Sequence, residues 1–525
     1  MNSIRSTSTC SVLLCLCLAA PLRAQQTSTQ APPIQAPATQ APAWRLSEAT
    51  RARLDSILAT PSAASGRIGL EVRLLGRAST SAQFPSTPLA SGPQTLFEHD
   101  AAKRFLPASN IKMFTVSSAL KYLGADFRVQ TRLLATGRRV GSTWRGDLFL
   151  VGGGDPTLAT SDLQNLALAL QKRGIKSIQG RIIGDGSALH AEAFGGRFPD
   201  TWALDDALWY YGAPISALAI DRNQIDITLA STEPGQLAKL STGAPADFPI
   251  INRARTTEPK SPQAINIGRA DANNVLSNTL SIEGDLPLGA RYTDGVAVPD
   301  PPRRAAWILK RALLSLNIKV SGAAANGALG NRASVELARH ASPPLSAMAS
   351  FCLKPSDNLS AEMILRLTAL HAGSPPRSGT EVRAHQMMRG WLSTISPHVS
   401  DARFVDGSGL GRYNMISPRL AVDLLSAVEH LPPAEGRAFW NALPIAGVDG
   451  TLRKRMKGTS AQSNVRAKTG SFSLASSLSG YLTTRDGFRL AVSFLSNFGS
   501  TDEMRGLQNQ VFHSLADAQL EASSP

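Results

Sequence analysis

Hydrophobic and polar positions alternate along this chain with two periods, which predict helices in some segments and strands in others. The first clear helix, which ends at Gly124, is predicted from the apolar residues Phe114, Val116, Ala119 and Leu120. Residues 127–131 alternate with a period of two, as expected of a strand that is half buried in a sheet. A second helical pattern covers residues 303–316, after a proline-rich break at 299–302.

The C-terminal part of the chain predicts a hairpin followed by a helix. Two apolar segments, 478–484 and 488–495, flank Asp486-Gly487, a dipeptide that favours the tight turn of a β-hairpin. Residues 505–520 follow a helical pattern with one apolar face, made of Leu507, Val511, Phe512 and Leu515. We therefore expect antiparallel strands and a closing helix at this end of the chain.

The N-terminal segment has the composition of a secretory signal. Arg5 supplies a positive charge, residues 11–20 are apolar, and residues 22–24 form an imperfect cleavage site, so we predict a signal peptide over residues 1–24. A retained anchor is the alternative, but the apolar stretch is shorter than the roughly 20 residues that span a bilayer. We expect residues 25–43 to form a disordered linker before the folded part, which begins near Trp44. The chain is thus predicted to act in the periplasm without a stable membrane anchor.

Composition narrows the chemistry further. With 525 residues and 43% hydrophobic content, the chain is long enough for two or more folding units. The sequence after residue 24 contains a single cysteine, Cys352, in an apolar context that predicts a packed side chain. None of the eight histidines has the spacing of a metal site, and we expect neither a metal nor another cofactor.

The chain is strongly basic, which points to an anionic partner. Removal of Arg5 and Arg23 with the signal lowers the formal net charge from +15 to +13. An exported protein meets the anionic cell wall first, and we find no helix-turn-helix or zinc-finger pattern, so no nucleic-acid partner is expected. Solubility alone is an equally good explanation of this charge.

Three short strings in a fixed order carry the candidate chemistry: Ser109-Asn110-Ile111-Lys112, Ser356-Asp357-Asn358 and Lys468-Thr469-Gly470. Ser109 and Lys112 are three residues apart in the first predicted helix, so their side chains share one face. Two other strings match by chance: Ser118-Ala119-Leu120-Lys121 and Ser315-Leu316-Asn317. At about 100° per residue, Ser118 points away from the face of Ser109. The three ordered strings therefore predict an active-site serine enzyme.

Each residue type suits one step of acyl transfer. A serine hydroxyl needs a base, and an uncharged Lys112 can accept its proton if burial or a second cation, Lys468, lowers the pKa of Lys112. Ser356 is suited to pass a proton to the leaving amine, and Asn358 to orient Lys112 and the substrate. We expect the backbone N–H groups of Ser109 and Ser471 to form the oxyanion hole. A helix cap before residues 359–367 is the structural alternative for Ser356 and Asn358, and it is compatible with catalysis.

The motif set is typical of penicillin-binding proteins and class A β-lactamases, and further strings resemble one family closely. The chain is similar to D-alanyl-D-alanine carboxypeptidases and endopeptidases of the penicillin-binding protein 4 type (low-molecular-mass class C). The resemblance covers nearly all of residues 100–500. It rests on the three motifs and on Pro107-Ala108, Gly154-Asp155-Pro156-Thr157-Leu158, Asp406-Gly407-Ser408-Gly409-Leu410, Leu443-Pro444-Ile445-Ala446-Gly447 and Asp449-Gly450-Thr451-Leu452.

The resemblance implies a fold and a domain plan. The fold is an α/β sandwich of the penicillin-recognising type, with an antiparallel sheet flanked by helices and interrupted by inserted β-rich domains, one nested in the other. The discontinuous catalytic domain is expected at residues 44–126 and 299–525. The insertion is expected at residues 127–298, in agreement with the long gap between Ser109 and Ser356.

The resemblance also implies the substrate. Peptidoglycan stem peptides would be cleaved at D-Ala-D-Ala, or at a crosslink between D-Ala and diaminopimelate, and β-lactams would be covalent inhibitors. Thr469 and Gly470 would bind substrate beside Lys468, while Asp155 and Arg412 would hold the diaminopimelate side chain. The alternatives are that Asp155 is a turn aspartate before Pro156 and that Arg412 is a surface arginine.

Two other functions remain as alternatives. A class A β-lactamase needs a deacylating glutamate in a Glu-x-x-x-Asn string, and none of the glutamates between the second and third motifs has Asn four residues later: Glu362, Glu381, Glu429 and Glu435. A catalytically idle penicillin-binding or wall-binding protein is disfavoured because all motif residues are intact. The sequence leaves open the balance between carboxypeptidase and endopeptidase activity, the diamino acid and the oligomeric state.

Overall fold

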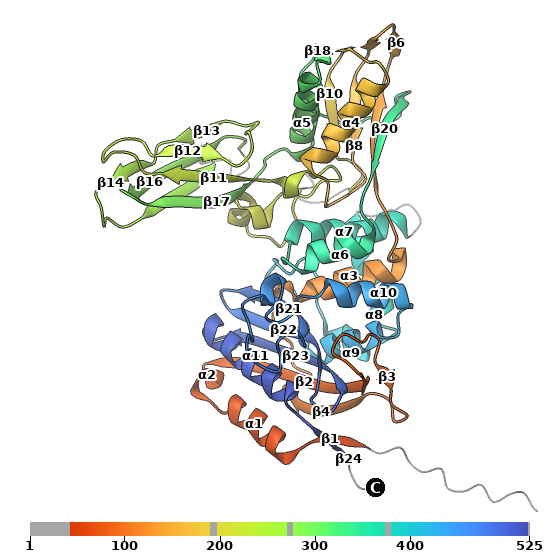
Figure 1. Ribbon diagram of the computed structural model, residues 1–525, viewed down its shortest axis with the longest axis vertical. Helices are drawn as coiled ribbons and strands as arrows, with labels where there is room; N and C mark the ends of the chain where they lie inside the picture. The colour runs from red at the N-terminus through yellow and green to blue at the C-terminus, as the bar shows by residue number, and fades with distance from the viewer. Residues whose placement is uncertain (1–42, 190–196, 270–276, 373–379, 523–525) are drawn as a thin grey trace, which may run out of the picture. The chain divides into compact units, whose positions relative to one another are not determined.

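A computed structural model of the chain describes residues 43–189, 197–269, 277–372 and 380–522 (Figure 1). The predicted signal peptide and nearly all of the predicted linker lie outside these residues. The described part begins at Ala43, and Trp44 opens the first strand. Within the described ranges, no helix is both long and apolar enough to cross a membrane.

The central sheet has six strands in the order β21-β22-β23-β2-β3, with β4 paired to β2, and all of its pairs are antiparallel. The predicted hairpin at Asp486-Gly487 is confirmed, because β22 and β23 pair on either side of it. The strands are β2 (Gly66–Arg77), β3 (Thr87–Pro88), β4 (Gln94–His99), β21 (Arg466–Phe472), β22 (Ala475–Thr483) and β23 (Phe488–Phe498).

Helices cover both faces of this sheet, and the alternation of side chains along β23 shows how. Leu490, Val492 and Phe494 join one apolar core, while Ala491 and Leu495 join the other, because successive side chains of a strand point to opposite faces. The first core packs under α1 (Glu48–Leu58), α2 (Pro61–Ala64) and α11 (Thr501–Ala516). The second packs under α3 (Ile111–Leu123), α6 (Leu345–Leu353), α7 (Asn358–His371), α8 (Thr380–Leu392), α9 (Pro418–Val428) and α10 (Pro433–Ala442).

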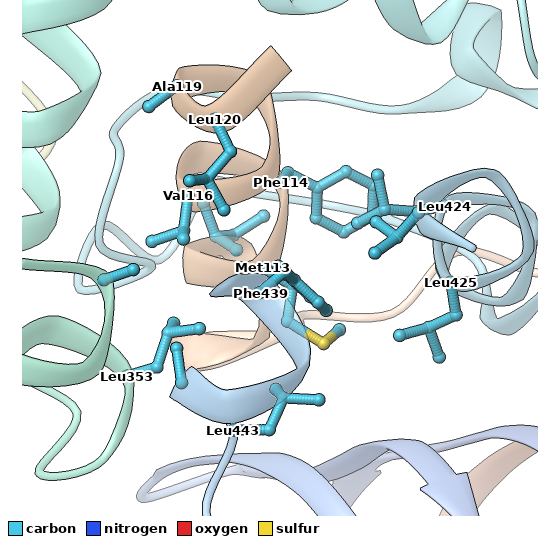
Figure 2. Packing of buried hydrophobic residues seen from close by; sticks show 14 of the residues in the cluster. Met113, Phe114, Val116, Ala119, Leu120, Leu353, Leu424, Leu425, Phe439 and Leu443 are labelled. Carbon is cyan, nitrogen blue, oxygen red and sulfur yellow. The ribbon is translucent and has the colours of Figure 1, made fainter. Parts of the chain in front are cut away.

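The predicted helix before Gly124 is α3, and it lies in the middle of the second core. Figure 2 shows its side chains Met113, Phe114, Val116 and Leu120 among residues of neighbouring helices, including Phe439 and Leu424. Gly124 has φ +83° and caps the helix, a conformation that glycine adopts without strain. This burial fixes α3, and with it the segment that carries Ser109.

The C-terminal helix ends before the predicted residue 520. Helix α11 ends at Ala516, whereas residues Leu520–Ala522 form strand β24, which pairs antiparallel with β1 (Trp44–Leu46). All four residues of the predicted apolar face are buried. The predicted helix extended to residue 520 because Leu520 is apolar. Its side chain is indeed buried, but as part of strand β24.

A second sheet, in the order β19-β10-β8-β5-β20, lies between the two parts of the catalytic sequence. Helices α4 (Thr160–Lys172) and α5 (Pro301–Ser315) belong to this unit, and a small sheet in the order β18-β9-β7-β6 extends it. The strands are β5 (Gln130–Ala135), β6 (Arg138–Val140), β7 (Thr143–Arg145), β8 (Leu148–Val151), β9 (Ser177–Gln179), β10 (Ile182–Asp185), β18 (Lys319–Val320), β19 (Ala324–Asn326) and β20 (Val335–Ala341).

A further β unit interrupts this inserted unit between β10 and α5. It contains one sheet in the order β12-β11-β17 and another in the order β13-β16-β14, with β15 paired to β16. The strands are β11 (Gln224–Ala230), β12 (Lys239–Thr242), β13 (Ile250–Asn252), β14 (Arg255–Thr257), β15 (Ala264–Arg269), β16 (Leu280–Pro287) and β17 (Arg291–Ala297).

The chain returns to the catalytic domain later than the predicted residue 299. Helix α5 packs Ala305, Leu309 and Leu313 against the inserted sheet, and β19 and β20 are strands of that sheet. The return comes after β20, where Ser342 and Leu345 donate backbone hydrogen bonds to the segment before β5. An amphipathic pattern shows that a helix has a buried face but does not tell which sheet covers it, so the pattern at 303–316 misplaced the boundary.

Candidate active site

Ser109 lies in a tight turn, η1 (Ala108–Asn110), directly before α3. Ala108 has φ +47°, a left-handed conformation that is strained for a residue with a Cβ atom. Strand β21 passes so close to this turn that a Cβ atom on Gly470 would lie 2.9 Å from the Ser109 nitrogen and 2.6 Å from the Pro107 oxygen. Glycine at position 470 therefore lets the third motif approach the backbone of Ser109.

The Lys112 ammonium is the centre of the hydrogen-bond network. Its Nζ atom lies 2.8 Å from Ser109 Oγ, 2.6 Å from Asn358 Oδ1 and 2.6 Å from the backbone oxygen of Ser408. The side chain is fully buried, yet these three acceptors satisfy all of its N–H groups. Ser109, Lys112 and Asn358 are thus brought together as predicted.

Burial lowers the pKa of Lys112 below its ordinary value of 10.5. The negative charges of Asp406, Asp357 and Glu362 oppose this effect without reversing it. Cys352 has no such effect at neutral pH, because burial raises the pKa of its thiol to about 12 and keeps it uncharged. Cys352 is buried and free, as its apolar context predicted.

Lys468 and Ser356 form a second pair. Lys468 Nζ lies 2.8 Å from Ser356 Oγ and 2.7 Å from the backbone oxygen of Thr469. Burial lowers the pKa of Lys468 well below 10.5, and the charge of Lys112 lowers it further. Ser356 has φ +66°, a second strained position among the motif residues.

Asn358 is the first residue of α7, and Asp357 caps this helix. Asp357 Oδ1 accepts a hydrogen bond of 2.7 Å from the Ser360 N–H, so the capping function falls on the middle residue of the motif and not on Ser356 or Asn358. The Asn358 amide is therefore free to bond elsewhere. Its Nδ2 atom donates to the backbone oxygen of Tyr211 at 2.9 Å, which directs Oδ1 to Lys112.

The loop at residues 406–411 supplies the third acceptor of Lys112, and two buried carboxylates shape this loop. Glu362 Oε1 accepts from the backbone N–H groups of Gly407 and Ser408, both at 2.8 Å. Asp406 accepts from the N–H groups of Gly409 at 2.7 Å and Gly411 at 2.6 Å. These bonds hold the Ser408 carbonyl oxygen toward Lys112.

Glu362 itself belongs to a chain of buried charges. Its Oε2 atom accepts from Arg366 Nη1 at 2.7 Å, and Arg366 also pairs with Glu381. Glu362 follows Asn358 by four residues, so the two side chains project from one face of α7. Glu362 lies outside the three motifs, and this spacing was the only signal in the sequence that relates it to Asn358.

The inserted region contributes directly to the site. Besides the Tyr211 carbonyl, Trp202 donates its indole N–H to Asp406 Oδ2 at 3.0 Å. Trp202 is buried and Tyr211 is half-buried, and both belong to the segment between β10 and β11. Motif reasoning missed these residues because they form no recurring pattern and act partly through backbone atoms.

Two cavities meet at Ser109, and both are also lined by Ser356 and Ser471. The smaller, of about 360 Å³, contains Asn358, Asp206, Tyr211 and Arg412. The larger, of about 800 Å³, contains Thr469, Gly470 and several cationic side chains. The predicted oxyanion-hole residues Ser109 and Ser471 therefore stand where the two cavities join.

Arg412 lines the smaller cavity, whereas Asp155 lines neither cavity. Asp155 is buried in a turn, where its Oδ1 atom accepts from the N–H of Thr157 at 2.8 Å and its Oδ2 atom lies 3.7 Å from His340 Nε2. It is thus a turn aspartate. The acidic residue that shares the cavity with Arg412 is Asp206.

Burial and neighbouring charges shift the pKa values of Asp206 and Tyr211. Burial raises the pKa of Asp206, and the charge of Arg412 opposes that rise. Burial, together with the charge of Asp206, raises the pKa of Tyr211 to about 12. Asp206 lies in a short 3-10 segment, η3 (Leu204–Leu208), which has no hydrophobic period to mark it in the sequence.

No group of three or more His, Cys, Asp or Glu side chains within the four described ranges is placed to hold a metal ion.

Comparison with known proteins shows the family to which the chain is related. The model of the D-Ala-D-Ala carboxypeptidase 3 (S13) family matches residues 87–517. A D-alanyl-D-alanine carboxypeptidase of Actinomadura sp. strain R39 is 32% identical over 81% of this chain and 79% of its own length. The D-alanyl-D-alanine carboxypeptidase DacB of Haemophilus influenzae is 29% identical over 78% of this chain and 84% of its own length.

Solved structures give the fold. The crystal structure of penicillin-binding protein 4 from Haemophilus influenzae superposes with a TM-score of 0.73 at 23% identity, over 87% of this chain and 99% of that chain. The predicted fold, a penicillin-recognising α/β sandwich with insertions, is confirmed. By its sequence match over most of its length, the chain belongs to the D-Ala-D-Ala carboxypeptidase 3 (S13) family.

Proposed function

We propose that this protein is a serine D-alanyl-D-alanine carboxypeptidase that acts on peptidoglycan stem peptides through an acyl-enzyme on Ser109. The observation that carries the proposal is the set of three acceptors around Lys112 Nζ: Ser109 Oγ, Asn358 Oδ1 and the Ser408 oxygen. Two of these acceptors, Asn358 Oδ1 and the Ser408 backbone oxygen, are carbonyl oxygens and can only accept hydrogen bonds from Lys112.

This arrangement prepares Lys112 to act as a base. A neutral amine has two N–H groups and one lone pair, and the carbonyl oxygens of Asn358 and Ser408 accept the two N–H groups. The lone pair then points to the remaining neighbour, Ser109, whose hydroxyl can donate its proton. Burial supports the neutral form, because it lowers the pKa of Lys112.

In the proposed reaction, Ser109 Oγ attacks the carbonyl carbon of the penultimate D-Ala while Lys112 takes the hydroxyl proton. The backbone N–H groups of Ser109 and Ser471 stabilise the oxyanion. Collapse of the tetrahedral intermediate breaks the amide C–N bond, and the leaving amine takes a proton through Ser356, which lies 2.8 Å from Lys468 Nζ. Water then hydrolyses the ester and releases the shortened peptide.

Deacylation of a β-lactam adduct should be slow. Among the residues that line the two cavities there is no glutamate. Glu362 and Glu381 bond to Arg366, Glu429 accepts from Ser86, and Glu435 accepts from Ala125 N. A β-lactam should therefore act as a long-lived inhibitor, which supports the peptidase over the β-lactamase alternative.

The smaller cavity fits a substrate side chain that carries both charges. Asp206 can pair with an ammonium and Arg412 with a carboxylate, as the side chain of diaminopimelate would require. We therefore propose for Asp206 the role that the family resemblance implied for Asp155. The proposal includes export through the predicted signal peptide to the periplasm, where the wall substrate lies.

The test is digestion of purified muropeptides with identification of the products by mass. We expect release of D-alanine from stem peptides that end in D-Ala-D-Ala, and loss of this activity in Ser109→Ala. Intact substrates after incubation with wild-type protein that still binds penicillin would contradict the proposed activity.

A further inference from the structure

Three consecutive residues directly before β11 adopt a left-handed backbone conformation. Asp221, Arg222 and Asn223 form the short 3-10 turn η5 (Asp221–Asn223), with φ angles of +49°, +57° and +52°. Aspartate and asparagine enter this conformation more readily than arginine does, because their short side chains can bond to the nearby backbone. Arg222 is therefore held in a conformation that its residue type does not favour, and such strain is concentrated at functional positions in proteins.

The two flanking residues hold this turn in place. Asp221 Oδ1 accepts from the Thr160 N–H at 3.1 Å, and Asp221 Oδ2 accepts from the Thr160 hydroxyl at 2.6 Å. Asn223 is fully buried, and its Nδ2 atom donates to the backbone oxygen of Pro214 at 2.9 Å. These bonds lie within the inserted region, so the inserted region fixes the backbone from which the Arg222 side chain projects.

The Arg222 side chain contacts both sides of the second motif. Its guanidinium lies over the Phe351 ring, 4.6 Å from the ring centroid, and its Nε atom lies 3.8 Å from Asp357 Oδ2. Phe351 belongs to α6, which precedes Ser356, and Asp357 follows Ser356 directly. Arg222 thus spans the turn that carries Ser356, a residue that is itself strained at φ +66°.

The two oxygens of Asp357 have different partners. Oδ1 caps α7 through the Ser360 N–H, whereas Oδ2 faces Arg222. Because Asn358 is the first residue of this helix, the cap also fixes the amide that bonds to Lys112. Burial lowers the pKa of Lys112, and the negative charge of Asp357 opposes this effect. A cation beside Asp357 offsets part of that charge and so favours the neutral amine.

Other ionisable groups also act on Lys112, and they come from α6, α7, β21 and the loop at residues 406–411: Cys352, Glu362, Lys468 and Asp406. These groups stay the same when Arg222 is replaced. A change in the pH profile of such a variant therefore reports on the pair of Arg222 and Asp357.

We propose that Arg222 is a positioning residue, which acts through Asp357 on the geometry and the charge of the second motif. This inference rests on the proposed acyl transfer and adds to it a dependence on a side chain of the inserted region. The strained turn η5 then has a function, because it places a cation against Phe351 and Asp357. A glycine at position 222 would relieve the strain and remove the cation, so stability and activity should respond differently.

The test measures penicillin acylation of Ser109 from pH 5 to 10 in Arg222→Met and Arg222→Lys, which keep a side chain at the strained position and differ in charge. We expect Arg222→Met to be acylated about 2- to 10-fold more slowly at pH 7. The midpoint of its profile should move up by roughly 0.1 to 0.7 pH units. Arg222→Lys should restore the wild-type midpoint, because its ammonium keeps a positive charge beside Asp357.

Arg222→Gly separates the strain from the function. Glycine adopts a φ of +57° without strain, so this variant should unfold at the wild-type temperature or above it, while its acylation slows as in Arg222→Met. The matched control is Lys260→Gly, which also removes a cation from a left-handed position, with φ +72°, in the exposed turn between β14 and β15. Lys260 lines neither cavity, and its replacement should leave the acylation profile unchanged.

A wild-type profile in Arg222→Met would overturn this role of Arg222, as would identical profiles in Arg222→Met and Arg222→Lys. A lowered unfolding temperature in Arg222→Gly, together with slower acylation, would assign Arg222 to stability alone. Wild-type protein that forms no penicillin adduct on Ser109 would instead overturn the proposed function.

Discussion

The Nζ atom of Lys112 lies 2.6 Å from the Oδ1 atom of Asn358, whose Nδ2 atom is held by the Tyr211 carbonyl at 2.9 Å. The amide thus offers Lys112 a neutral acceptor. Asn358→Asp would replace it by a carboxylate, which raises the pKa of a neighbouring ammonium by about 1 to 3 units. We expect penicillin acylation at pH 7 to fall about 10- to 1,000-fold and to recover toward higher pH. A pH profile with the wild-type midpoint would show that Lys112 is not the titrating base.

The pH dependence of the wild type follows from the lowered pKa of Lys112. Acylation needs the neutral amine, so its rate should rise with pH through a midpoint below 10.5, the ordinary value for lysine. Lys112→Arg should lose about 100- to 10,000-fold in acylation rate at all pH values, because a guanidinium does not release its proton. Stopped-flow or gel measurement of acylation from pH 5 to 10 checks both statements, and a flat wild-type profile would contradict them.

Lys468 should lower stability near neutral pH. Its folded-state pKa lies well below 10.5, so the unfolded chain binds more protons between these two values, and stability rises with pH in that window. Lys468→Met removes this buried group and should raise the unfolding temperature at pH 7 more than at pH 10, while acylation is lost. Thermal unfolding at the two pH values is the measurement. An equal change at both would mean that Lys468 titrates normally.

Glu362 is expected to act on Lys112 through the loop that it holds. Glu362→Gln would weaken two bonds to backbone N–H groups, each worth roughly 1.5 to 3 kcal/mol when charge-assisted, and should slow acylation at least about 10-fold. Glu381→Gln is the control, because Glu381 also pairs with Arg366 but has no bond to the loop. Because Glu381 bonds to Arg366 and not to the loop that holds the Ser408 carbonyl oxygen, this change should alter acylation little. Equal acylation rates in the two variants would assign Glu362 to stability alone.

Asp206 and Asp155 can be separated by substrate choice. Asp206→Asn removes the carboxylate that shares the smaller cavity with Arg412, and it should lower kcat/KM for diaminopimelate peptides by about 10- to 150-fold. Asp155→Asn should lower the unfolding temperature and spare the preference for these peptides, because Asp155 lines neither cavity. The reverse pattern would restore the original assignment of Asp155.

Much of the central geometry could be predicted from the sequence because it depends on local periodicity. Ser109 and Lys112 share a face through helical spacing, and the β22–β23 hairpin was marked by Asp486-Gly487. These features need only short stretches of chain. The hydrogen bond between Lys468 and Ser356, by contrast, was not predicted, because it joins two segments that are far apart in the sequence and no local pattern relates them.

The rest could not be predicted because it depends on contacts between distant segments. Trp202 and Asp206 come from an irregular segment of the inserted region, where no period indicates which residues face the site. Tyr211 acts on Asn358 through a backbone oxygen, which any residue type could supply. The family string Gly154-Asp155-Pro156 was found correctly, but a shared string does not show whether its aspartate faces a substrate or closes a turn.

The most direct test of the whole account is the site of penicillin attachment. Wild-type protein incubated with a fluorescent penicillin, digested and examined by mass spectrometry should carry the adduct on the peptide with Ser109. Ser109→Ala should carry none, whereas Ser118→Ala should be labelled like the wild type. An adduct that persists in Ser109→Ala, or that maps to Ser118, would contradict the assignment of Ser109 as the nucleophile.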